Sequence, residues 1–142
     1  MTGMESLPLG VLPDMDLRKA LESAVAARRC HAAFVVSGIG SLRPACLRLA
    51  GRAETDTLDA DVEILTLAGT VSSDGSHLHA SVANAEGRVF GGGMLPTAAL
   101  YGQLPNFCCF CSPNGRSSAK WIRLRDLRNS LSVRKADKSR CV

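Results

Sequence analysis

The fold is decided by residues 63–94, which read EILTLAGTVSSDGSHLHASVANAEGRVFGGGM. Strand-like residues lie on both sides of an Asp74-Gly75 pair, which is a strong turn signal. The pattern predicts a strand over residues 62–71, a second over residues 76–83 and a short return at residues 88–90. The stretch therefore predicts a β-meander, in which consecutive strands run antiparallel.

The same stretch contains a His-x-His pair and a glycine triplet. Side chains two residues apart in a strand share a face, with Cα atoms about 6.5–7 Å apart, so His77 and His79 can lean on one metal ion. A functional zinc site usually has three protein ligands, so the pair is either half of a metal site or two polar residues on a solvated face. The triplet at residues 91–93 indicates backbone packed closely against another segment.

Upstream of this stretch, the pattern predicts one helix and further strands. Asp14 and Asp16 are both N-cap candidates, and apolar residues then recur at helical spacing, which predicts a helix over residues 16–29. A short strand is expected at residues 6–12. We also expect two strands at residues 32–37 and 42–49, joined by the loop Ser-Gly-Ile-Gly-Ser. That loop is interpreted as a turn rather than an anion cradle, because no helix start follows it.

Length and composition indicate one soluble domain. The chain has 142 residues, and no apolar run approaches the roughly 18–20 residues that a membrane span requires. The N-terminal residues lack a basic segment followed by a long apolar block. We therefore expect a cytoplasmic protein with no membrane partner, in which the six cysteines are free thiols.

Charge is divided unevenly along the chain. Residues 1–93 contain 8 Lys or Arg and 11 Asp or Glu, a net charge of −3, whereas residues 94–142 contain 9 Lys or Arg and 2 Asp, a net charge of +7. A basic terminal segment either contacts nucleic acid or is simply solvated. The cluster Cys108, Cys109 and Cys111 in this segment lacks the second pair that a zinc knuckle needs, so free thiols are favoured.

Residues 7–95 resemble the plant-and-prokaryote-conserved (PPC) domain family in its bare prokaryotic form. The resemblance rests on the helix opening DLRKAL, the segment SGIGSL, the strand EILTLAGT, the turn and strand SSDGSHLH, and GRVFGG. It implies an α+β fold in which a twisted, largely antiparallel sheet packs against helices, and it implies a homotrimer. Plant members carry an AT-hook that binds the A·T-rich minor groove, but no Arg-Gly-Arg hook core is present here.

The resemblance also bears on metal binding. Many prokaryotic members complete a three-histidine site with the histidine of a GGH motif, and here His77 and His79 match while Gly93 occupies the position of the third ligand. A zinc or other divalent metal ion at this incomplete site would need water, His31, Asp74 or a neighbouring subunit.

The resemblance ends near residue 96. We therefore divide the chain into a PPC-like core at residues 1–96 and an atypical basic segment, rich in Cys, Arg and Ser, at residues 97–142. A basic helix is expected over residues 122–131. One hypothesis for the atypical segment is a shifted reading frame near residues 93–97.

Two hypotheses about function follow from these observations. The first is a non-enzymatic PPC-domain protein with a DNA-associated or regulatory role. The second is a metal-dependent small-molecule-binding protein or enzyme that uses His77 and His79 at a subunit interface. The sequence contains no nucleophile elbow, phosphate-binding loop, dinucleotide fingerprint or zinc-protease motif, so we predict no catalytic and no cofactor-binding residues besides the metal pair.

Overall fold

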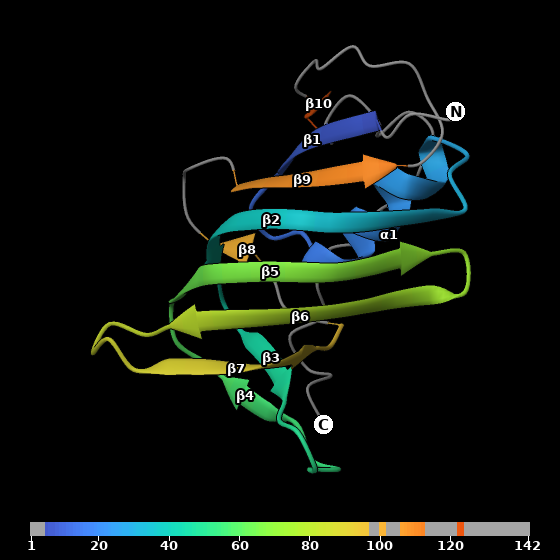
Figure 1. Cartoon of the computed structure of the whole chain (residues 1–142). Coiled ribbons are helices and arrows are strands. Elements are labelled where there is room, and N and C mark those ends of the chain that lie inside the picture. The colour runs from blue at the N-terminus through green and yellow to red at the C-terminus, as the bar shows by residue number, and fades with distance from the viewer. Residues whose placement is uncertain (1–4, 97–99, 102–105, 113–121, 124–142) are drawn as a thin grey trace.

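The computed structural model describes residues 5–96, 100–101, 106–112 and 122–123. Within these residues the strands form one largely antiparallel sheet in the order β10-β1-β9-β2-β5-β6-β7-β3-β4, with β8 paired to β2 (Figure 1). The pairing of β1 with β10 is parallel. The strands outside the meander are β1 (Glu5–Val11), β2 (Ala32–Leu42), β3 (Ala45–Arg48), β4 (Asp56–Leu58), β8 (Leu100–Tyr101), β9 (Asn106–Ser112) and β10 (Ile122–Arg123).

The predicted meander is confirmed. It consists of β5 (Val62–Ser72), β6 (Gly75–Ala83) and β7 (Val89–Met94), and β6 pairs antiparallel with both neighbours. The turn between β5 and β6 falls at Ser73 and Asp74, where the Asp-Gly signal predicted it. A loop closed by the hydrogen bond from the Gly87 N–H to the Asn84 carbonyl joins β6 to β7.

The glycine loop predicted after residue 36 is wrong. Residues 37–41 continue β2, which runs unbroken from Ala32 to Leu42. The physical reason is pairing on both sides, since β2 hydrogen-bonds to β5 along one edge and to β9 and β8 along the other. A register shift between Val35 and Ser37 lies just before the two glycines, which are themselves paired in the sheet.

The predicted helix is confirmed as α1 (Leu17–Ala27), which ends two residues earlier than expected. Asp16 is its N-cap, and the Asp16 carboxylate accepts a hydrogen bond of 2.9 Å from the Lys19 N–H. Among the described residues α1 is the one α-helix, so the expectation of several helices against the sheet overstated the helical content. No helix in these residues is long and apolar enough to cross a membrane.

The sheet has one buried face and one exposed face, because successive side chains of a strand point to opposite sides. The inner face carries the core and is packed against the buried side of α1. Ser76 Oγ donates a hydrogen bond of 2.5 Å to Glu22 Oε1, which fixes the helix to the start of β6. The outer face carries the residues between the buried ones on β6, including both predicted metal ligands. Buried core residues include Leu9, Leu17, Leu21, Val35, Leu42, Leu47, Leu67, Val71, Leu78, Val82 and Met94.

Part of the segment that the sequence set apart contributes strands to this sheet. β9 lies between β1 and β2, and it pairs antiparallel with both (Figure 1). Cys108, Cys109 and Cys111 lie on this extended strand, which differs from the turn that a zinc knuckle uses. The predicted basic helix is wrong at its start, because Ile122–Arg123 forms β10, and the remainder lies outside the described residues. The division of the chain at residue 96 stays a prediction.

Two described cysteines differ in oxidation state. Cys30 carries a thiol, whose Sγ donates a hydrogen bond of 2.9 Å to the Ala32 carbonyl. Cys46 on β3 is buried and disulfide-bonded, so the expectation of free thiols is wrong there.

The expected close packing of the glycine triplet is confirmed at Gly92. A Cβ atom at this position would lie 2.5 Å from the Arg48 carbonyl oxygen on β3. Real Cβ atoms do not approach an oxygen so closely, so a side chain here would force β3 away from β7. The neighbouring Gly93 is different, because the nearest atom to its Cβ position would be the Arg48 carbonyl oxygen at an ordinary 3.9 Å.

Candidate metal centre

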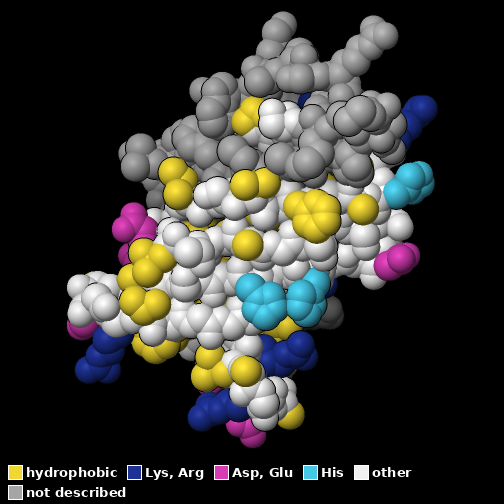
Figure 2. All heavy atoms as spheres, viewed as in Figure 1, with side chains coloured by type: hydrophobic (Ala, Val, Ile, Leu, Met, Phe, Trp, Pro, Cys, Tyr) yellow, Lys and Arg dark blue, Asp and Glu magenta, His cyan; other side chains and the backbone are white. Residues whose placement is uncertain are grey.

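The site is built on β6, where His77 and His79 point away from the core. Leu78, between the two histidines, and Ala80, which follows them, are buried. The two exposed imidazoles therefore share the outer face of the sheet. Their Nε2 atoms are 3.0 Å apart, and the ring centroids are 4.9 Å apart with an angle of 51° between the ring planes. Figure 2 shows the two rings side by side on the surface.

The distance between the rings fits a shared metal ion. Two nitrogen ligands 2.0–2.1 Å from a tetrahedral zinc ion lie roughly 3.3–3.4 Å from each other, close to the observed separation. The same 3.0 Å also fits a hydrogen bond in which one ring donates to the other. Both interpretations from the sequence, half of a metal site and a polar pair on a solvated face, therefore match the geometry.

Gly93 lies beside His79, at a position from which a side chain could reach a metal ion held by the two imidazoles. It is the direct partner of His79 in the pairing of β6 with β7, so the two Cα atoms share the outer face. A directly opposed side chain starts about 5 Å from that of His79. Glycine supplies no donor, however, and the position next to His79 on β7 is empty of side chain.

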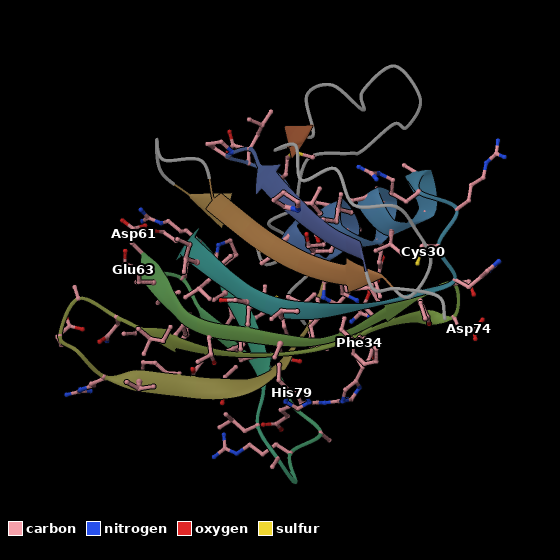
Figure 3. All side chains as sticks on the ribbon, turned by 45° about the horizontal axis from the view of Figure 1, so that its top comes forward. Cys30, Phe34, Asp61, Glu63, Asp74 and His79 are labelled. Carbon is pink, nitrogen blue, oxygen red and sulfur yellow. The ribbon has the colours of Figure 1, made fainter. Side chains whose placement is uncertain are left out.

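The other ligands considered from the sequence do not complete the site. Asp74 lies in the β5–β6 turn, well away from His79 (Figure 3), and the His31 carbonyl accepts from the Ser73 N–H at the same end of the hairpin. Within the part of the chain that the structure describes, no group of three or more His, Cys, Asp or Glu side chains is arranged to hold a metal ion. Among the described residues the candidate site therefore consists of the two imidazoles.

Hydroxyl groups lie beside the histidines on the same face. Ser81 follows His79 by two residues on β6, and its Oγ is 2.6 Å from Thr66 Oγ1 on β5. The Ser81 N–H also donates to Thr66 Oγ1 at 3.2 Å. The site thus has fixed polar groups next to the imidazoles that the sequence pattern alone did not single out.

Apolar side chains surround the histidines on the outer face (Figure 2). Phe34, Thr70 and His77 are aligned across β2, β5 and β6, and the Phe34 side chain is 54% exposed. Figure 3 shows Phe34 and His79 on the same side of the sheet. The exposed large hydrophobic residues among those described are Phe34, Val36, Ile39, Leu65 and Val89. Such an apolar surface on a sheet marks a protein interface or a ligand site.

A hollow that sequence reasoning missed lies at the end of the sheet. It has a volume of about 200 Å³ and is lined partly by Ser41, Asp61, Glu63 and Asn84. Asp61 is held by Arg43, whose Nη1 is 3.1 Å from Asp61 Oδ1. No sequence signal could have found this hollow, because its residues come from strand ends that meet only through the sheet register.

The chain matches the model of one known protein family. The family model of the plants and prokaryotes conserved (PCC) domain matches residues 1–104. The bifunctional protein GlmU of Synechococcus sp. (strain JA-3-3Ab) is 44% identical over 94 residues, which are 66% of this chain and 15% of that protein. The chain thus spans a small part of the length of this relative.

Two solved structures show the same fold. A hypothetical protein from Salmonella cholerae-suis is 26% identical, with a TM-score of 0.72 and coverage of 80% of each chain. A metal-containing protein from Archaeoglobus fulgidus is also 26% identical, with a TM-score of 0.63 and coverage of 79% of this chain and 81% of its own.

Proposed function

The chain belongs to the plants and prokaryotes conserved (PCC) domain family, and we propose that within it this protein is a non-enzymatic binding module that holds a divalent metal ion such as zinc through His77 and His79. The observation that carries the proposal is the 3.0 Å separation of the two Nε2 atoms on a solvent-exposed strand face. The metal-containing relative from Archaeoglobus fulgidus, which has the same fold, supports it. A bound metal ion would supply a fixed positive charge with open coordination positions for a ligand.

Removing either imidazole tests the metal site. We expect His77→Ala and His79→Ala each to abolish stoichiometric zinc binding, because one remaining imidazole is a weak ligand. The measurements are metal content by elemental analysis and zinc titration by calorimetry. His31→Ala is the matched control, since it removes the same exposed residue type from beside the β5–β6 turn, outside β6. Zinc-free wild-type protein, or equal binding by all three variants, would contradict the proposal.

The module would act as a homotrimer. The support is the apolar outer face, where five large side chains are at least half exposed on the strands around the histidines. A neighbouring copy packed against this face would bury them and could bring a further ligand to the metal ion. Light scattering should then give a mass about three times that of the 15.0 kDa chain. A monomer at micromolar concentration would contradict this assembly.

DNA association is a second candidate function, favoured by the concentration of positive charge after residue 93. Removing all residues after 96 would be a poor test, because β9 lies inside the sheet. Residues 124–142 contain six Lys or Arg and two Asp and lie beyond the last described strand. If this segment contacts phosphates, its deletion should weaken binding to duplex DNA and reduce the slope of log affinity against log salt. Unchanged affinity and slope would rule out the segment as a DNA contact.

A further inference from the structure

A basic side chain lies in the same row of the sheet as the histidine pair. Arg48 on β3 is the register partner of Gly93 on β7, and Gly93 is the register partner of His79 on β6. Directly opposed residues share a face of an antiparallel sheet, so Arg48, Gly93 and His79 all belong to the outer face. Figure 2 shows Lys or Arg side chains next to the two imidazoles.

Gly93 leaves a gap between the two functional groups. The strands on either side of β7 place the Cα atoms of Arg48 and His79 roughly 9–10 Å apart, twice the usual spacing between strands. A side chain at position 93 would occupy the space between them, and glycine leaves this space open. The gap is wide enough for a small ion or a small polar ligand to lie between a guanidinium group and the imidazoles.

The charge around the gap favours an anion. Arg48 is exposed, and no carboxylate among the described residues forms an ion pair with it. The residues opposite His77, His79 and Ser81 on β5 are Thr70, Ala68 and Thr66. On β7, Gly93 lies opposite His79 and Gly91 lies opposite Ser81. None of these neighbours is acidic. One of the hydroxyl groups of Thr66 and Ser81 donates to the other, so this pair has one further O–H to donate at one side. A guanidinium group has the fork geometry that suits carboxylate and phosphate oxygens.

From this arrangement we propose that the site binds a small oxyanion, a carboxylate or a phosphate, in the gap over Gly93, between Arg48 and the metal ion held by His77 and His79. The inference rests on the proposed metal site and specifies the class of its ligand. One oxygen of the anion takes an open position on the metal ion, and another accepts hydrogen bonds from the Arg48 guanidinium group. Gly93 determines the site by leaving the space that the anion occupies.

The experiment uses cobalt(II) in place of zinc, because its visible absorption changes when a metal ligand is exchanged. The full chain is loaded with cobalt(II) and titrated with malonate at constant ionic strength. We expect a saturable spectral change for the wild type, about a tenfold loss of malonate affinity for Arg48→Met, and an intermediate loss for Arg48→Lys, which keeps the charge without the fork.

Arg88→Met is the matched control. It removes the same charge from an exposed arginine that lies five residues before Gly93, roughly 17 Å away along the strand and beyond the screening length of the buffer. Its malonate affinity should equal that of the wild type. Equal affinity in Arg48→Met and the wild type, or equal losses in Arg48→Met and Arg88→Met, would overturn the anion site.

The experiment distinguishes a failure of the metal site from a failure of the anion site. If the wild type takes up no cobalt(II), the metal site is wrong and the anion site falls with it. If cobalt(II) uptake is normal in the wild type and both arginine variants but malonate leaves the spectrum unchanged, the metal site stands and the anion site alone is overturned.

Discussion

Replacing Gly69 with alanine is expected to lower the free energy of unfolding by about 3 kcal/mol or more. Gly69 lies on β5 opposite Leu78, with φ +144°, a conformation that residues with a side chain rarely adopt. A Cβ atom there would collide with the His77 carbonyl oxygen and lie 2.9 Å from Leu78 Cα. Because both contacts are with backbone, β6 itself would have to move. Urea denaturation of the purified variant measures the loss.

Gly87→Ala separates the two causes of this loss. Gly87 also has a positive φ, +77°, but nothing lies within 4 Å of its Cβ position. Its replacement should therefore cost only the backbone strain, about 1 kcal/mol. Equal losses in the two variants would show that the collision with β6 does not matter. Since the atom that Gly69→Ala strikes belongs to His77, the same variant should also weaken metal binding if it stays folded.

The sequence predicted those parts of the fold that local signals determine. The Asp-Gly turn fixed the β5–β6 hairpin, and with it the alternation that places His77 and His79 on one exposed face. Asp16 as an N-cap fixed the start of α1. In each case the residues that decide the structure lie within a few positions of one another.

The parts that sequence reasoning missed depend on pairing between distant segments. Residues 37–41 have the composition of a turn, yet they continue β2 because β9, some seventy residues later, supplies hydrogen bonds along its second edge. Arg48 is separated from His79 by 31 positions, and only the register through Gly93 brings the two into one row. Nothing in the local sequence of β3 indicates such a partner.

The sequence predicted the two histidines of the candidate site but not the groups that surround them. Its two imidazoles follow from the period of a strand, and the register confirms that Gly93 is next to His79. Thr66 and Ser81 are opposite each other because the register of β5 shifts between Ile64 and Thr66. No sequence pattern predicted this shift. Long-range register therefore determines what surrounds the histidines.

Gly93→His is expected to raise zinc affinity roughly 100-fold. Four-ligand structural zinc sites bind with about 10–16 kcal/mol, so one ligand contributes roughly 2.5–4 kcal/mol, of which part is lost in ordering the new side chain. Position 93 accepts a side chain, since its backbone has no positive φ and its Cβ position meets Arg48 oxygen at 3.9 Å. The new imidazole would start directly beside that of His79. Competitive zinc titration with a chelator measures the gain.

Gly91→His is the matched control for this gain. It introduces the same residue on the same strand and face, but opposite Ser81 and one alternate position away from His79. Its gain in zinc affinity should be much smaller, because the register places the new imidazole beside a hydroxyl group. An unchanged affinity in Gly93→His would show that position 93 is not next to the metal ion.

The histidine at 93 would also fill the gap in front of Arg48, so Gly93→His should bind zinc more tightly and malonate more weakly than the wild type. Opposite changes in the two affinities from one substitution would place residue 93 beside the metal ion and in the space that the anion occupies.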